Sequence, residues 1–348
     1  MGVSFTFLNT AIFIGTNYSV STVIGCVIVG GILEGILGLF AKYWMKIISP
    51  IVAATVVTAI GFSLLSVGAN SFAGGQGAAD FGSVQNWIIG SVTLISCLAF
   101  NIFFRGYLKV ISVLFGLIVG YVLSICFGMV DFSVLKETSI ISLPTFLPFK
   151  PEFNISAIIS MLVIYLVSAT ETIGDATAVS ETALHRKISE KELSGALAVD
   201  GFVSSIAGLF GCTPITSFSQ NIGLVAMTRV VNRFTIGTGA IIMILAGIFP
   251  VFGSLLTTVP QAVLGGCTIM MFGTIVVAGF QLVGNCGFTA RNTTIVALSL
   301  SVGLGFTQCA NMFTIFPKII QSVFAENCVA VVFVLAILLN LLLPKIGR

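Results

Sequence analysis

The sequence predicts an all-α membrane protein that crosses the bilayer many times. Hydrophobic residues make up 57% of the 348 residues and charged residues 8%, with a mean hydropathy of +1.14. A soluble domain of this length carries far more charge. Apolar runs of about 20 residues, long enough to cross the hydrocarbon core as helices, recur along the chain with short breaks.

Ten apolar runs are predicted to span the membrane as helices. They cover residues 20–40, 50–68, 86–104, 109–129, 155–180, 194–212, 234–255, 260–282, 290–307 and 327–343. Two further segments, 4–15 and 215–232, each begin with a short β-prone piece and then turn helical. Together these segments predict about twelve membrane segments.

Basic residues in alternate loops predict the orientation in the membrane. The loops 69–84 and 253–259 carry no Lys or Arg. By the positive-inside rule, the 182–193 loop and the C-terminus are expected to lie in the cytoplasm, with the chain in the plasma or inner membrane. The basic residues on this side are Lys42, Lys46, Arg105, Lys109, Arg186, Lys187, Lys191, Arg229, Arg233, Arg291, Lys345 and Arg348.

A four-residue echo indicates an internal repeat. Residues 4–7 read Ser-Phe-Thr-Phe and residues 217–220 read Ser-Phe-Ser-Gln. The predicted spans run the two copies through the membrane in opposite directions, which is typical of inverted-repeat transporters with a midplane site. Chance similarity between Phe- and Ser-rich segments is the alternative. The spans 155–180 and 194–212 lead into the second copy, whereas three residues precede the first. We therefore expect a form truncated by two segments, or else a naturally shorter protein.

Acidic residues inside the apolar runs mark the candidate site. Glu171 and Asp175 lie four residues apart and share one helix face among small residues. A carboxylate at the centre of a membrane helix costs about 2.5–3.5 kcal/mol on insertion scales, so such groups persist when they bind, pair or carry protons. The basic residues within the ten spans, Lys109 and Arg291, lie at span ends, so none is expected to pair with the two carboxylates. We expect this pair to bind a ligand or exchange a proton.

Two other acidic residues leave their roles open. Asp200 follows the cytoplasmic loop, and its predicted role is either helix capping or function. Glu34 lies toward the cytoplasmic end of its span. There it is expected to be structural, reaching the interface or pairing with Lys42 or Lys46.

Amide and aromatic side chains complete the candidate site. Gln220 and Asn221 begin a half-helix whose free backbone N–H groups also point at the midplane. A planar heterocycle with imide-type N–H and C=O groups matches this set, since a carboxylate accepts from an N–H and an amide pairs with both groups. Phe5 or Phe218 is suited to stack on such a ring.

Several function classes are excluded. The sequence has no Walker A motif, dinucleotide fingerprint or nucleophile elbow, so neither an enzyme nor an ATP-driven pump is expected. The eight cysteines form no C-x-x-C pair and there is one histidine, so no metal or cofactor is expected. The net charge of +3 is scattered through short loops and indicates no nucleic-acid partner.

Three motifs together resemble the nucleobase–ascorbate transporter (nucleobase:cation symporter-2) family over the whole chain. They are Ser4-Phe5, Glu171-Thr172-Ile173-Gly174-Asp175, and Gln220-Asn221-x-Gly223-x-x-x-x-Thr228-Arg229. The resemblance implies a 7+7 inverted-repeat fold with two discontinuous strand–helix segments, here lacking the first two transmembrane segments. It also implies a core domain, 1–45 and 151–258, and a gate domain, 46–150 and 259–348.

The resemblance also implies roles for individual residues. Glu171 would be the main substrate-binding carboxylate and Gln220 the second side-chain contact. Phe5, Ser219 and Asn221 would complete the substrate site, Asp175 and Asp200 would shape it or couple it to protons, and Gly223, Thr228 and Arg229 belong to the family motif.

The function so implied is a proton symporter of purine nucleobases, xanthine and/or uric acid, because Asp175 and Gln220 match the purine branch. The alternatives are a uracil permease of the same family, an inactive truncated member, and an anion transporter of the same architecture. Besides the lipid bilayer, the partners so implied are the nucleobase and the coupling proton. The family often forms homodimers, so a homodimer is an open alternative.

Overall fold

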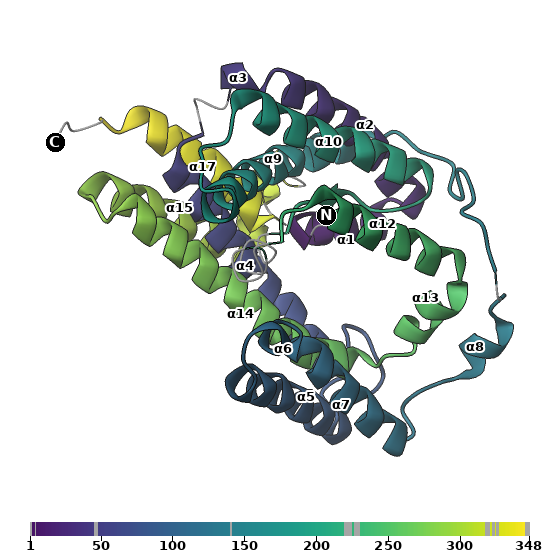
Figure 1. Cartoon of the computed structure of the whole chain (residues 1–348). Helices are drawn as coiled ribbons and strands as arrows, with labels where there is room; N and C mark the ends of the chain where they lie inside the picture. The colour runs from purple at the N-terminus through teal and green to yellow at the C-terminus, as the bar shows by residue number, and fades with distance from the viewer. Residues whose placement is uncertain are drawn as a thin grey trace. The chain divides into compact units, whose positions relative to one another are not determined.

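The structure, a computed structural model, describes residues 2–3, 5–44, 48–139, 141–218, 225, 230–316, 321, 324 and 327–344. Helices dominate it (Figure 1). The longer ones are α1 (Leu8–Asn17), α2 (Val20–Leu39), α4 (Pro50–Phe72), α5 (Val84–Phe103), α7 (Ser112–Cys126), α9 (Ile155–Ala183), α10 (Glu190–Leu209), α12 (Arg233–Ile248), α13 (Pro250–Thr257), α14 (Gln261–Cys286), α15 (Ala290–Gln308) and α17 (Cys328–Leu342). The short elements are β1 (Gly2–Val3), η1 (Phe5–Phe7), α3 (Ala41–Trp44), α6 (Tyr107–Val110), α8 (Ser133–Glu137), β2 (Ile215–Thr216) and η2 (Ala310–Ile315).

Each predicted span contains a helix. Within the described part of the chain, six helices are long and apolar enough to cross a membrane, namely α2, α4, α5, α9, α10 and α14. The bent pair of α12 and α13 makes a seventh if it is one span, and α7 and α17 are apolar but shorter. The described part of the chain is therefore mostly helical with six or seven apolar spans, and the total of about twelve segments stays a prediction.

One predicted span, 234–255, is wrong as a single helix. It consists of α12 and α13, which meet at an angle of 80°. Phe249 has an extended backbone, the conformation favoured before a proline, and Pro250 opens α13 as its first helical residue. Because Pro250 has no N–H to donate, α12 cannot continue through it.

Side-chain caps fix where the two helices of the candidate site begin. Asn154 accepts hydrogen bonds from the backbone N–H groups of Ser156 and Ala157 at 3.0 and 3.2 Å, which starts α9. At the start of α10, Ser189 and Glu192 form a reciprocal capping box.

The chain divides into two compact units. One contains Met1–Ser63, Thr145–Gly223 and Ile275–Arg348, and the other contains Leu64–Pro144 and Leu224–Thr274. Two of the four boundaries fall within helices, one in α4 and one in α14. This partition by contacts does not test the predicted core and gate domains, which stay a prediction.

In the first unit, α2 and α10 lie side by side at very close range (Figure 1). A Cβ atom on Gly201 would lie 2.1 Å from the backbone nitrogen of Gly35, and one on Gly38 would lie 2.4 Å from that of Ala198. Glycine at these positions therefore lets the two backbones touch. Small residues allow this approach within a bilayer, where packing drives helix association.

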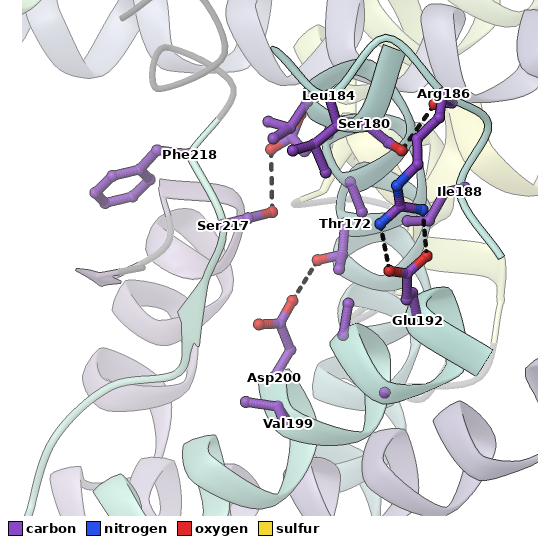
Figure 2. A pocket seen from close by; sticks show the side chains of 15 residues that line it. Thr172, Ser180, Leu184, Arg186, Ile188, Glu192, Val199, Asp200, Ser217 and Phe218 are labelled. Carbon is purple, nitrogen blue, oxygen red and sulfur yellow. Dashed lines mark hydrogen bonds and ion pairs between the residues drawn. The ribbon is translucent and has the colours of Figure 1, made fainter. Parts of the chain in front are cut away.

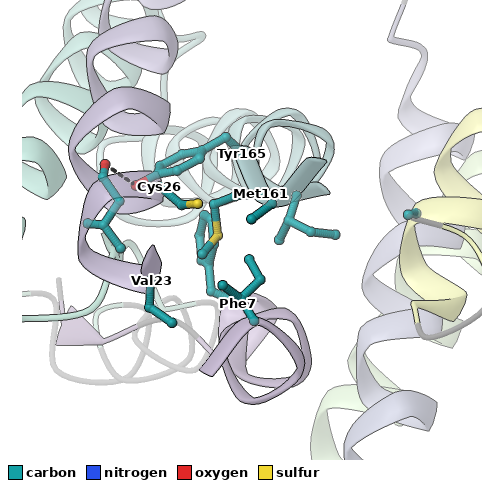
Figure 3. Packing of buried hydrophobic residues seen from close by; sticks show 10 residues of the cluster. Phe7, Val23, Cys26, Met161 and Tyr165 are labelled. Atoms are coloured by element: carbon teal, nitrogen blue, oxygen red, sulfur yellow. Dashed lines mark hydrogen bonds between the residues drawn. The ribbon is translucent and has the colours of Figure 1, made fainter. Parts of the chain in front are cut away.

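Helix α9 packs against α2 and the N-terminal segment in the same unit. Tyr165 donates a hydrogen bond to the carbonyl of Val27 at 3.0 Å, and its ring meets that of Phe7 edge-on with centroids 4.6 Å apart (Figure 3). Met161 and Cys26 are buried in the same cluster. This cluster fixes the height of α9 relative to the residues that precede α1.

Each of the two strands directly precedes one copy of the sequence echo, and the strands pair with each other. Strand β1 pairs with β2 in antiparallel register, with Gly2 opposite Thr216 and Val3 opposite Ile215. The Ser204 hydroxyl of α10 donates to the carbonyl of Ile215 and accepts from its N–H, both at 3.1 Å. The short sheet is thereby held against α10.

The second unit is built around α5 and α7, with part of α14. A Cβ atom on Gly116 would lie 2.1 Å from the Cys97 sulfur, so α7 approaches α5 closely. The Sγ atoms of Cys97 and Cys267 lie 3.8 Å apart, and both residues are buried. These cysteines pack as small apolar groups, as the sequence predicts for most of the eight.

Candidate functional site

The Glu171 carboxylate is the centre of the candidate site. It lies on α9 and accepts a hydrogen bond from the Thr6 hydroxyl, with Oγ1 and Oε2 2.8 Å apart. Thr6 belongs to η1 and is buried, with 6% of its surface exposed. The two predicted segments, the N-terminal one and α9, are therefore joined at the acidic residue itself.

Asp175 lies one turn further along α9. It is buried and accepts a hydrogen bond from the hydroxyl of Ser217, with the oxygens 3.1 Å apart. Ser217 directly follows β2, and Figure 2 shows its side chain extending from that segment toward α9. Each carboxylate of the predicted pair thus accepts a hydrogen bond from a hydroxyl group, and each copy of the sequence echo supplies one of these hydroxyls.

Two aromatic rings from the same two copies face each other. The centroids of Phe5 and Phe218 lie 6.5 Å apart, and their planes differ by 24°. This separation is at the wide end of the range for aromatic pairs. A Cβ atom on Gly2 would lie 2.9 Å from the Phe218 ring, so the absence of a side chain there admits the ring.

Asp200 is buried near the middle of α10, with 1% of its surface exposed. It accepts a short hydrogen bond from the Thr172 hydroxyl (Figure 2). Thr216 lies 3.2 Å, hydroxyl to hydroxyl, from both Thr172 and Ser168. Because α10 begins at Glu190, Asp200 cannot cap it, and the capping alternative is wrong. Hydroxyl groups instead connect Asp200 to α9 and β2.

Glu34 does not reach the interface as expected. It is 2% exposed, and neither carboxyl oxygen has a hydrogen-bond partner in the described part of the chain. Lys42 forms an ion pair with Glu190 instead, at 3.6 Å, and Lys46 lies outside the described residues. The physical reason is the close approach of α2 to α10 at the neighbouring Gly35, which turns this part of α2 inward.

A cavity of about 490 Å³ lies between α9, α10 and the segment after β2 (Figure 2). Arg186 and Glu192 line this cavity and form a bidentate ion pair, with nitrogen–oxygen distances of 2.6 and 2.8 Å. These hydrogen bonds hold the pKa of Arg186 above its usual value. The volume suits a small heterocycle. Among the lining residues are Thr172, Asp175, Asp200, Ser217 and Phe218.

Some predicted site residues lie outside the described residues. They are Ser219, Gln220, Asn221, Gly223, Thr228 and Arg229, and their roles stay predictions. Sequence reasoning missed the hydroxyl residues Thr6, Thr172, Thr216 and Ser217. Their signal was present, since each lies beside a predicted acidic residue or within a few residues of the sequence echo.

The described part of the chain has the mostly helical fold of a polytopic membrane protein. It matches the transmembrane domain of a cyanobacterium bicarbonate transporter, BicA, with a TM-score of 0.64 over 94% of this chain and 80% of that one, at 16% identity. A family model described as "Permease family" matches residues 1–312. The chain therefore belongs to this permease family, the nucleobase–ascorbate transporters that its motifs resemble.

Curated relatives agree over most of the chain. Xanthine permease XanQ of Escherichia coli (strain K12) is 36% identical over 359 residues, 98% of this chain and 76% of that protein. The xanthine permease of Bacillus subtilis (strain 168) is 32% identical over 345 residues, 98% of this chain and 78% of that protein. Uric acid permease PucK of the same strain is 33% identical over 317 residues, which are 90% of this chain and 73% of that protein. The predicted family and multi-pass cell-membrane location are confirmed.

Proposed function

We propose that this chain is a secondary active transporter that carries purine nucleobases, xanthine and/or uric acid, together with protons. The observation that carries the proposal is that Glu171 on α9 accepts a hydrogen bond from Thr6, the residue that follows Phe5 of the Phe5–Phe218 ring pair. The names of the relatives, two xanthine permeases and a uric acid permease, support purine nucleobases as the substrate class.

The chemistry of the site matches an oxidised purine. Such a ring is planar and carries N–H donors along its edges, so a carboxylate such as Glu171 can accept from it. The ring faces are apolar and suit the phenylalanine pair. In this proposal Gln220 and Asn221 pair with the opposite edge, and Ser219 contributes its backbone.

The carboxylates supply the groups that proton coupling needs. The hydrogen bonds described for Glu171 and Asp200 come from threonine hydroxyls. A hydroxyl can donate to a carboxylate, and it can also accept from a carboxylic acid, so it tolerates both protonation states. In this proposal Asp175 shapes the site or takes part in the coupling.

Alternating access follows from the predicted domains. The core domain, 1–45 and 151–258, would move against the gate domain, 46–150 and 259–348, in a 7+7 inverted repeat. The antiparallel pairing of β1 with β2 supports the repeat, because it brings the two copies of the sequence echo together with opposite directions.

The test is uptake of radiolabelled xanthine by cells that lack their own purine permeases, with excess urate, uracil, guanine or hypoxanthine as competitor. We expect competition by urate and none by uracil. Glu171→Ala should abolish uptake, whereas Glu190→Gln, a surface variant whose partner is Lys42, should retain it. Competition by uracil would assign the chain to the pyrimidine branch, and absence of uptake at normal expression would indicate an inactive member.

A double substitution tests the assignment to the purine branch. The family resemblance implies that uracil transporters carry His where this chain has Asp175 and Glu where it has Gln220. Asp175→His combined with Gln220→Glu should therefore move the competition profile from urate toward uracil. An unchanged profile would contradict the roles assigned to Asp175 and Gln220. The acidic face of Glu171 and Asp175 argues against the alternative of an inorganic-anion transporter.

A further inference from the structure

We propose that Glu34 is a second proton-carrying group of the transport cycle and exchanges its proton with Asp200 across the contact of α2 with α10. The proposal rests on the proton-coupled transport proposed above. It assigns a role to a residue that the substrate site does not use and that none of the sequence motifs includes.

The first observation is the state of the Glu34 side chain. It is 2% exposed, and both of its carboxyl oxygens are without a hydrogen-bond partner among the described residues. An ionised carboxylate without a partner is strongly disfavoured in such surroundings. Glu34 therefore holds a proton in this conformation, or it faces a neighbouring group that shares one.

The second observation is the position of Asp200. Glu34 and Asp200 precede Gly35 and Gly201, the two glycines at which the backbones of α2 and α10 touch. The glycines thus bring two acidic residues to one level of the helix contact, where two negative charges cannot easily coexist.

The groups that face Glu34 leave Asp200 as its exchange partner. From α10 the facing charged group is Asp200, and from α9 the facing titratable group is Tyr165, whose hydroxyl donates to Val27. Helix α1, which also packs on α2, has no titratable side chain. Lys42, further along the chain, is paired with Glu190.

Asp200 connects Glu34 to the substrate site. Its hydroxyl partner is Thr172, the residue next to Glu171. A proton that leaves the substrate site for Asp200 can pass to Glu34. The O–H bond on Asp200 breaks as the O–H bond on Glu34 forms, so one acid becomes neutral while the other becomes charged.

The test compares two modes of transport by purified Glu34→Gln in proteoliposomes. Glutamine keeps the size and cannot carry the proton. Accumulation of xanthine driven by a pH gradient should fall by about tenfold or more relative to the unsubstituted chain, since a positioned proton carrier is lost. Exchange of external for internal xanthine without a gradient should remain within about twofold, since the binding site is intact. Glu190→Gln serves as the control and should preserve both.

Infrared spectroscopy provides a readout apart from transport. The difference spectrum between the unsubstituted chain and Glu34→Gln should contain the carbonyl stretch of one protonated carboxylic acid. Gradient-driven accumulation equal to that of the unsubstituted chain, with the same pH profile, would overturn the proposal and leave Glu34 a structural residue. Absence of xanthine transport by the unsubstituted chain would instead contradict the proposed function.

A second variant covers the case in which Glu34→Gln does not fold. Glu34→Asp keeps the carboxyl group on a shorter side chain. A proton carrier predicts that this variant accumulates xanthine with a shifted pH profile, because the distance to Asp200 has changed. An unaltered pH profile at lower protein yield would show a structural role and overturn the proposal.

Discussion

At the scale of single residues, hydroxyl groups organise the acidic site. Glu171, Asp175 and Asp200 accept from Thr6, Ser217 and Thr172, respectively. A hydrogen bond to a charged group contributes about 1.5–3 kcal/mol. That is enough to fix the orientation of a carboxylate, and it leaves the charge available to a substrate or a proton.

Thr6→Val should weaken substrate binding without removing the carboxylate. Valine keeps the shape and loses the hydroxyl that donates to Glu171. We expect KM for xanthine to rise about tenfold or more, because the lost bond corresponds to roughly 1.5–3 kcal/mol. Thr6→Ser keeps the hydroxyl and should stay near the original KM. Equal KM values for the two variants in uptake assays would show that the bond does not position Glu171.

Sequence reasoning located the acidic residues but not their partners. The spacing of Glu171 and Asp175 predicts their shared helix face from four residues alone. Their partners come from distant parts of the chain, since Thr6 and Glu171 are 165 residues apart. The sequence echo marks these hydroxyl residues, but no local pattern assigns each of them to its carboxylate. Glu34 was misjudged for the same reason, because its burial depends on which face of α2 meets α10.

At the scale of elements, the contact between α2 and α10 leaves very little room for change. Gly201 and Gly35 meet backbone to backbone, and a Cβ atom on Gly31 would lie 2.5 Å from the Ser205 hydroxyl oxygen. Interiors at this density do not absorb an added methyl group without a shift of the helices.

Gly201→Ala should therefore destabilise the protein, by about 1–3 kcal/mol as expected for overpacking. The added Cβ atom would lie 2.1 Å from the Gly35 nitrogen. Gly237→Ala is the matched control, because nothing lies within 4 Å of its added Cβ atom and alanine favours a helix. Thermal unfolding in detergent should show a lower Tm for Gly201→Ala and an equal or higher Tm for Gly237→Ala. A Tm that is unchanged in Gly201→Ala would contradict the close contact.

Hydropathy and length predicted the helices because a segment in lipid must pair its backbone N–H and C=O groups internally, and a helix does this. Each predicted span has a helix, and α2 and α9 begin at the predicted residues. The break between α12 and α13 was missed, although Pro250 was visible in the sequence. Continuous hydropathy across 234–255 outweighed a single proline in that prediction.

At the scale of the whole molecule, the basic residues predict which ends of the helices face outward. Helices α7, α10 and α15 each follow a loop predicted to be cytoplasmic, so their C-terminal ends should face the outside. Cys126 ends α7, while Cys212 and Cys309 closely follow α10 and α15, and all three are exposed.

A membrane-impermeant thiol reagent should therefore label intact cells at these three cysteines. Substituting Cys126, Cys212 and Cys309 together by serine should abolish the labelling. Cys286→Ser should not change it, because Cys286 ends α14 on the side predicted to face the cytoplasm. Labelling that requires permeabilised cells would reverse the predicted orientation. The buried cysteines should react only after denaturation, and they are Cys26, Cys97, Cys267 and Cys328.

The pairing of β1 with β2 has a consequence for biogenesis. Gly2 pairs with Thr216, so the first strand of this sequence has no partner until more than two hundred further residues have been synthesised. At about 5–20 residues per second, translation leaves it unpaired for roughly 10–40 s. The bond from Thr6 to Glu171 is delayed in the same way. The proposed substrate site should therefore assemble only after α2 and α9 have entered the bilayer.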